Sequence, residues 1–227
     1  MRRTLAVVAV SLACVLPAAA AGELPTILPK PRFNTPAGTP KPSAVRFELI
    51  SSVPRDPGQL LDGPRPLGLR IEGDVVTAPR RYAFDFRNYV WPPRIAPGER
   101  GFVDERVQFA KESEGVLYVE TSHLTYARSS LGLNAYLNAI DLKTRKLRWR
   151  SPALVANARN FVLAGDVLVT GYGFTAETDY LYALDARTGR VLARLLVPSA
   201  PERIARHGRT LTVDTYDHTL VVRLVGG

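Results

Sequence analysis

Residues 136–150 read YLNAIDLKTRKLRWR, and residues 180–194 read YLYALDARTGRVLAR. The two stretches align without a gap at a spacing of 44 residues, and six of their 15 positions are identical. An apolar run precedes each copy, at residues 116–121 and 167–171. Propeller blades of four short strands repeat at about 40 to 50 residues. The repeat therefore predicts stacked, four-stranded β-units.

The chain on either side of the two copies has the same character. Short apolar runs, rich in β-branched and aromatic residues, occur at residues 45–50, 116–119, 167–170 and 220–224, and Gly, Pro, Asp and Asn separate them. Runs of this length and spacing indicate an all-β domain. At the observed spacing, residues 44–227 hold about four units.

Each copy contains the pattern Ala-x-Asp-x-x-Thr, which begins at residue 139 in the first and at residue 183 in the second. We expect its carboxylate, Asp141 or Asp185, to accept hydrogen bonds from the backbone of the following turn. Gly189 closes the second turn with a positive φ. Arg145 takes that position in the first copy, where a positive φ costs roughly 1 kcal/mol. Trp149 is expected to lie flat across the gap to the next unit.

This motif resembles the tryptophan-docking blade motif of the pyrroloquinoline-quinone-like (quinoprotein) propeller superfamily. The match is specific over residues 115–196 and weakens over residues 197–224. The resemblance implies an all-β fold: a small β-propeller of about four four-stranded blades, either incomplete or closed by an N-terminal strand. Residues 45–50 are the candidate for that strand, and residues 67–91 for the first blade. The chain holds about half the strands of a quinoprotein enzyme, so we interpret it as a short, non-enzymatic member.

The second copy departs from the motif at one place. Ala193 stands where the first copy has Trp149. We expect that junction either to be packed by other side chains or to lie at an edge.

The N-terminal residues indicate export. Arg2 and Arg3 precede an apolar run and a small-residue stretch, so residues 1–21 are typical of a secretory signal peptide. Residues 22–43 form a proline-rich leader, and residues 44–227 form the propeller-like repeat domain. This arrangement predicts a periplasmic or secreted protein. Lipidation of Cys14 is the alternative, although no polar tether follows it.

Composition excludes several classes of function. The net charge is +9, but from Ala44 onward 25 basic residues oppose 20 acidic ones, and they are scattered. Nucleic-acid binding needs a clustered basic face. The single cysteine leaves with the signal peptide, so no Cys-ligated metal is expected. His123, His207 and His218 lack zinc-site spacing. We predict no catalytic residues, no metal, no cofactor, no nucleic-acid partner and no transmembrane segment.

Loops on one side of the blades combine asparagines, aromatics and acids, which suit peptide, sugar-like or planar polar ligands. The alternative is that they form Asx turns and blade packing. Glu177 and Asp179 could bind calcium or act in acid–base chemistry, but a solvated hairpin loop is favoured. The candidate binding residues are Asn134, Asn157, Asn160, Tyr172, Phe174, Glu177, Asp179 and Tyr216.

These observations favour an exported binding or scaffold protein that engages a protein or glycan partner in the cell envelope or outside the cell. An open sheet edge would also allow oligomerisation. Two other hypotheses remain: a reduced quinoprotein dehydrogenase, and a carbohydrate-binding module.

Overall fold

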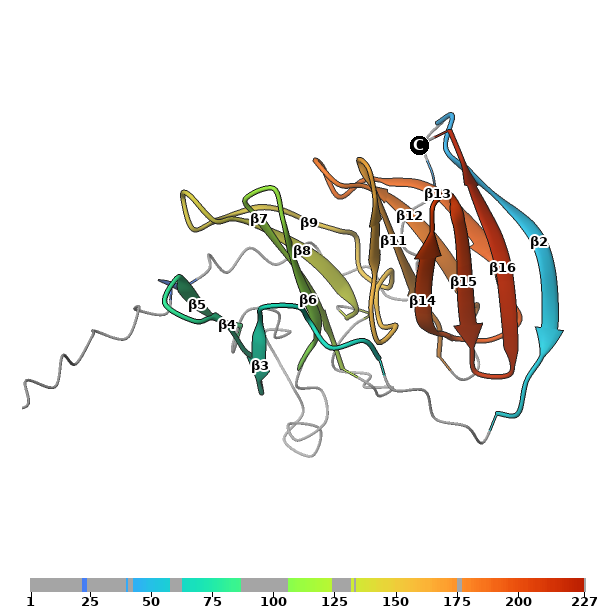
Figure 1. The fold of residues 1–227 in the computed structure, drawn as a ribbon, viewed down its shortest axis with the longest axis horizontal. Coiled ribbons are helices and arrows are strands. Elements are labelled where there is room, and N and C mark those ends of the chain that lie inside the picture. Colours follow the sequence, from blue (N-terminus) through green and yellow to red (C-terminus); the bar gives the residue numbers. More distant parts are fainter. Residues whose placement is uncertain are drawn as a thin grey trace, which may run out of the picture.

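The computed structural model describes residues 22–23, 40, 43–57, 63–86, 106–123, 132, 134–174 and 177–226. Every regular element in these ranges is a β-strand. The strands form four four-stranded sheets (Figure 1). The proposed signal peptide, Cys14 and nearly all of the proline-rich leader lie outside the described residues, and so does Trp91 of the predicted first blade.

Strands that follow one another in the chain pair within each sheet. We call the strand that begins each such run the inner strand, and the strand at the opposite edge of the sheet the outer strand. The first sheet contains β3 (Arg70–Glu72), β4 (Val75–Ala78) and β5 (Tyr82–Asp85). The second contains β6 (Arg106–Ser113), β7 (Val116–Ser122), β8 (Tyr136–Asp141) and β9 (Lys146–Arg150). The third contains β10 (Val162–Ala164), β11 (Val167–Tyr172), β12 (Tyr180–Asp185) and β13 (Val191–Leu196). The fourth contains β14 (Pro201–His207), β15 (Thr210–Thr215) and β16 (His218–Val225).

N-terminal strands complete the first and last sheets. β2 (Arg46–Pro54) pairs antiparallel with β16, which confirms that residues 45–50 contribute to a strand that joins the last sheet. β1 (Gly22–Glu23) pairs with β5, and this pairing is parallel, whereas every other pairing in the four sheets is antiparallel. The all-β prediction of four four-stranded units is therefore confirmed.

The two sequence copies adopt the same register. Asp141 pairs with Val116, and Asp185 pairs with Val167 at the matching place. In both copies a bulge follows the motif alanine, at Ala139 in the second sheet and at Ala183 in the third. Identical irregularities at equivalent positions show that the repeat in the sequence is a structural repeat.

The predicted turn chemistry is also present. The Asp141 carboxylate accepts a hydrogen bond from the Thr144 amide at 2.8 Å, and Arg148 donates to its other oxygen. These two contacts hold the pKa of Asp141 at about 2. Arg145 has a φ of 57° and Gly189 a φ of 69°, so both residues adopt the left-handed conformation.

Trp149 docks the second sheet onto the third. Its indole Nε1 donates to the Ala186 carbonyl oxygen at 3.1 Å. Its ring lies over Gly189, where an added Cβ would sit 2.8 Å from ring atom Cδ2. At the next junction Ala193 is buried among side chains of the third and fourth sheets, including Ile204 and Leu224. That junction is therefore packed by other side chains, one of the two expected outcomes.

The four sheets follow one another as a fan, with the first and fourth at opposite ends (Figure 1). Three buried apolar clusters join the first sheet to the second, the second to the third, and the third to the fourth. Among the described residues, no such cluster joins the fourth sheet back to the first. Within these ranges the arrangement is an open row of blades.

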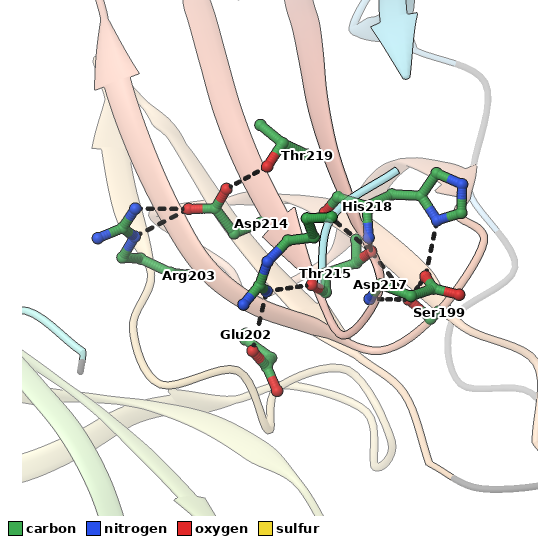
Figure 2. Close-up of polar contacts among 9 residues, drawn as sticks. Ser199, Glu202, Arg203, Asp214, Thr215, Asp217, His218 and Thr219 are labelled. Atoms are coloured by element: carbon green, nitrogen blue, oxygen red, sulfur yellow. Dashed lines mark hydrogen bonds and ion pairs between the residues drawn. The ribbon is translucent and has the colours of Figure 1, made fainter. Parts of the chain in front are cut away.

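Ion pairs lie on both end faces of this row. On the outer face of the fourth sheet, Arg203 and Thr219 bond the Asp214 carboxylate at 2.9 and 2.8 Å (Figure 2). On the outer face of the first sheet, Arg70 pairs with Glu72 at 2.6 Å. Terminal units of a repeat array need polar outer faces to stay in water. The open ends are consistent with that requirement.

The outer edge of the row differs from blade to blade. The outer strand β9 exposes Lys146 and Arg148, and charged edges resist pairing with another chain. The outer strand β2 instead has no charge over residues 49–54. Leu49, Ile50 and Val53 are 52%, 50% and 58% exposed there. β2 is therefore less protected than β9.

Candidate functional site

A pocket of about 670 Å³ is lined by residues on, or next to, the inner strands of all four sheets. The first sheet contributes β3 and the segment before it, the second contributes β6, and the third contributes the loops around β10 and β11. The start of β14 completes the wall. The lining residues are Gly63, Pro64, Arg65, Pro66, Ile71, Gln108, Phe109, Asn157, Arg159, Gly173, Phe174, Ala200, Pro201 and Glu202.

Two of the predicted binding residues, Asn157 and Phe174, line this pocket. The Asn157 amide donates to the Gly173 carbonyl at 2.8 Å and accepts from the Gly173 amide at 3.1 Å. Gly173 has no room for a side chain, since a Cβ would lie 2.5 Å from the Ala200 Cα. Asp179 accepts from the Phe174 amide at 3.0 Å. Asn157 and Asp179 thus fix the loop that carries Phe174.

Charge in the pocket is predominantly positive. The guanidinium groups of Arg65 and Arg159 are on exposed side chains, and within the described ranges neither forms an ion pair or side-chain hydrogen bond. The Glu202 carboxylate is paired with Arg55 at 3.3 Å, and these two side chains are only 18% and 11% exposed. Arg55 also donates to the Thr215 carbonyl at 2.6 Å. Glu202 is therefore neutralised within the wall.

Long-range packing builds the pocket. Gly63 lies against the third sheet, because a Cβ there would sit 2.8 Å from the Arg159 carbonyl oxygen. The Arg159 amide in turn donates to the Glu202 carbonyl at 2.9 Å. The segment that leaves the fourth sheet for the first is thereby held against the loop before β10. This contact brings Arg65 and Arg159 to one cavity.

The other two predicted asparagines brace the backbone away from the pocket lining. Asn134 accepts from the His123 amide at 2.8 Å and donates to the His123 carbonyl at 3.0 Å. Asn160 makes the same pair of bonds to the backbone of Ile204, at 2.9 and 2.8 Å. Both amides are buried. Both are long-range braces to the backbone of another segment, 11 and 44 residues away in the chain, and so differ from the local Asx turns that were the alternative.

The remaining predicted residues lie around the loops of the third and fourth sheets. The Tyr172 hydroxyl donates to the Glu177 carboxylate. Burial raises the pKa of Asp179 to about 6. Tyr216 is exposed beside β16. Tyr172, Glu177 and Tyr216 do not line the pocket, so the structure brings only part of the predicted set together.

Sequence reasoning missed several pocket residues. Arg65 sits between two prolines and Arg159 between two asparagines, so each lies in a stretch with loop character. Phe109 and Gln108 are on β6, and nothing in a strand pattern marks them as ligand-facing. A search for cationic side chains in loops next to rigid turn residues could have found the two arginines.

Ser199, Asp217 and His218 form a polar cluster at the end of the fourth sheet (Figure 2). The Ser199 hydroxyl and the His218 Nδ1 both contact the same Asp217 oxygen. A catalytic triad needs the imidazole beside the nucleophile, with the carboxylate behind it. Here the carboxylate stands between the two, and the Ser199 and His218 contacts lower its pKa. A carboxylate of lowered pKa is a weaker base. We therefore interpret the cluster as a structural contact that holds the segment before β14 against the turn before β16.

Glu120 is buried between the second and third sheets, behind the pocket wall. It pairs in register with Phe109, and neither carboxylate oxygen has a hydrogen-bond partner within the described part of the chain. Burial raises its pKa well above the ordinary value. Thr170 of β11 also has a hydroxyl without a partner there. Burial without a partner therefore favours the neutral acid form of Glu120 over the carboxylate.

No group of three histidine, cysteine or acidic residues capable of holding a metal ion occurs among the residues that the structure describes. In the same ranges no helix is long and apolar enough to cross a membrane. The site consists of a cationic, partly aromatic pocket on a row of blades. The protein is thus an all-β, propeller-like protein with a pocket at the convergence of its sheets.

No family model matches the sequence, and no curated protein matches it. Among solved structures, the chain is similar to quinohemoprotein alcohol dehydrogenase ADHIIG from Pseudomonas putida HK5, at 13% identity and a TM-score of 0.40. It is also similar to BamB from Moraxella catarrhalis, at 11% identity and a TM-score of 0.37, and to the computationally designed Ika4 protein, at 11% and 0.34. The matches cover 64%, 69% and 53% of this chain. The chain spans 33% of the dehydrogenase, 54% of BamB and 91% of Ika4.

Proposed function

We propose that this protein is an exported, non-catalytic binding protein that engages a protein partner of the cell envelope through the pocket between its sheets. The observation that carries the proposal is the pocket itself. It gathers cationic, aromatic and proline side chains from four sheets onto one surface. Such convergence of loops on a rigid repeat scaffold is a common form of binding site.

The polar chemistry of the described residues supports binding over catalysis. In the Ser199 cluster, Asp217 separates Ser199 from the His218 imidazole, and the lowered pKa of Asp217 makes its carboxylate a weak base. Glu120 is buried without access to the pocket lining. The two pocket arginines attract negatively charged groups, and a guanidinium group stays protonated in proteins, so it cannot accept a proton.

The volume of the pocket suits a short peptide segment of a protein partner. A volume of about 670 Å³ lies within the range of ligand pockets, and it admits a few side chains of an inserted loop. Pro64, Pro66 and Pro201 stiffen the wall, so little ordering entropy is lost when a partner binds.

Site-specific crosslinking in the native cell envelope tests this proposal. The full chain carries benzoylphenylalanine at position 174, and a control carries it at position 209. Arg209 lies in the turn between β14 and β15, at the end of the fourth sheet opposite the pocket. We expect a discrete crosslinked protein from position 174 and none from position 209. Equal products from both positions, or none from either, would contradict the proposal.

Two further readouts separate the remaining hypotheses. A crosslinked product that glycosidase removes and protease leaves intact would favour the carbohydrate-binding hypothesis. Dye reduction by the full chain supplied with pyrroloquinoline quinone, calcium and an alcohol would favour the dehydrogenase hypothesis and overturn our proposal.

A further inference from the structure

The pocket has an electrostatic character that selects among ligands. We infer that its occupant is an acidic peptide segment, whose carboxylate is bound by Arg65 and Arg159 while an adjacent apolar side chain packs on Phe174 and Phe109. The inference rests on the proposed binding function and gives it a chemical class of ligand. It is carried by two arginines that line one cavity and have no ion-pair partners among the described residues.

The local charge balance leaves those two cations unopposed. Glu202 is the carboxylate in the pocket lining, and Arg55 already neutralises it from inside the wall. Asp179 lies behind the wall, where one of its oxygens accepts the Phe174 amide. A carboxylate that enters the pocket therefore meets a net positive field and can form charge-assisted hydrogen bonds, which are stronger than neutral ones.

The identity of the cations also points to a carboxylate. Arginine offers a planar fork of donors that matches the two oxygens of a carboxylate. Two such forks next to aromatic rings fit an acidic side chain that is flanked by an apolar one. A nucleic-acid backbone would need a longer row of cations than the two arginines that line this pocket.

The backbone that carries these groups is rigid, which favours specific binding. Arg159 lies between Asn157 and Asn160, each of which bonds the backbone of a neighbouring segment. Arg65 lies between Pro64 and Pro66, which limit its backbone freedom. The two side chains are therefore presented from fixed positions, and the entropy lost on binding is confined to the side chains.

Calorimetric titration of the full chain with defined peptides tests the inference. The probes are acetyl-Gly-Ser-Asp-Phe-Gly-Ser-amide, the same peptide with Asn in place of Asp, and the Asn peptide with a free C-terminal carboxylate. We expect the Asp peptide to bind at least tenfold more tightly than its Asn analogue, the loss typical of one charge-assisted hydrogen bond. The free-carboxylate peptide shows whether a chain terminus serves as well as a side chain.

Matched variants connect binding to the pocket. Arg65→Gln and Arg159→Gln are each expected to weaken the Asp peptide about tenfold, and Arg159→Lys to retain part of the affinity. Arg209→Gln removes an arginine at the opposite end of the fourth sheet and should leave binding unchanged. Unaltered melting temperatures show that the variants remain folded.

Three results would overturn the inference: no binding of any acidic probe at 10 mM ionic strength, equal affinity for the Asp and Asn peptides, or equal loss in the Arg209→Gln control. If crosslinking at position 174 still captures a protein while the acidic peptides do not bind, the binding function stands and the acidic ligand does not. If both fail, the pocket is not a binding site.

Discussion

The turn at Arg145 offers a test of the repeat at the level of one residue. Arg145 and Gly189 occupy equivalent places after the motif aspartate, with φ values of 57° and 69°. Their amides donate to the Asp141 and Asp185 carbonyl oxygens at 2.7 and 2.8 Å. The Arg145 side chain is exposed, and within the described part of the chain it makes no ion pair or side-chain hydrogen bond. Arg145→Gly therefore removes strain without removing a contact.

The size of the effect follows from two opposing terms. A left-handed conformation costs an L-residue about 1–2 kcal/mol, and glycine avoids that cost. Glycine also loses more conformational entropy on folding, which returns about 0.5–1 kcal/mol. We expect Arg145→Gly to raise the free energy of unfolding by about 0.5–1 kcal/mol, or the melting temperature by about 1–4 °C for a domain of this size.

Gly189 gives the reciprocal perturbation. Gly189→Ala introduces the same strain and places a Cβ 2.8 Å from the Trp149 ring atom Cδ2, so that the docked indole must move. Overpacking of this kind costs about 1–3 kcal/mol beyond the strain. We expect Gly189→Ala to lower the free energy of unfolding by at least about 2 kcal/mol.

Urea and thermal unfolding followed by circular dichroism measure both effects. Arg145→Ala is the control, since it removes the charge but keeps a side chain at positive φ, and it should leave stability close to that of the wild type. A lower melting temperature in Arg145→Gly would refute the turn assignment. A neutral Gly189→Ala would refute the docking of Trp149 on this turn.

Three further predictions follow from the packing, the buried acid and the exposed edge. Trp149→Ala should lower the free energy of unfolding by about 3–5 kcal/mol in urea unfolding, because a buried indole between two sheets is lost; a loss below about 1 kcal/mol would contradict docking. Burial raises the pKa of Glu120 above its unfolded value, so stability should fall as pH rises from about 4.5 towards the folded pKa. Glu120→Gln should flatten that part of the pH profile of the melting temperature, and an unchanged profile would show that another group is responsible. Ile50 lies on the uncharged stretch of β2, so light scattering should detect association at high protein concentration that Ile50→Lys abolishes; a strictly monomeric wild type would contradict this.

The blade pattern could be predicted because its information is local. Each copy contains its own Asp–Thr turn and its own strand periodicity, and strands that follow one another in the chain pair within one sheet. The positive φ at Arg145 followed from alignment with Gly189, and the structure confirms it. The first sheet was the least certain part, because only residues 82–85 echo the motif, and its strands do form there.

The candidate site was predicted less completely. The asparagines were marked because their residue type suits ligand binding, yet Asn134 and Asn160 direct both ends of their amides to backbone groups. An amide gives the same sequence signal whether it binds a ligand or a neighbouring loop. Phe174 and Asn157 lie at the pocket, whereas Arg65 and Arg159 carry no periodic signature.

What the sequence determined by itself is the repeating unit: its short strands, its Asp–Thr turns and its docking tryptophan. These depend on contacts within one blade or between neighbouring copies, so the order of residues contains them. Only the tertiary structure decided that β2 completes the last sheet, that the sheets form an open row within the described residues, and that Arg65 and Arg159 line one pocket. Those outcomes depend on how segments far apart in the chain pack together, and that geometry has no local pattern in the sequence.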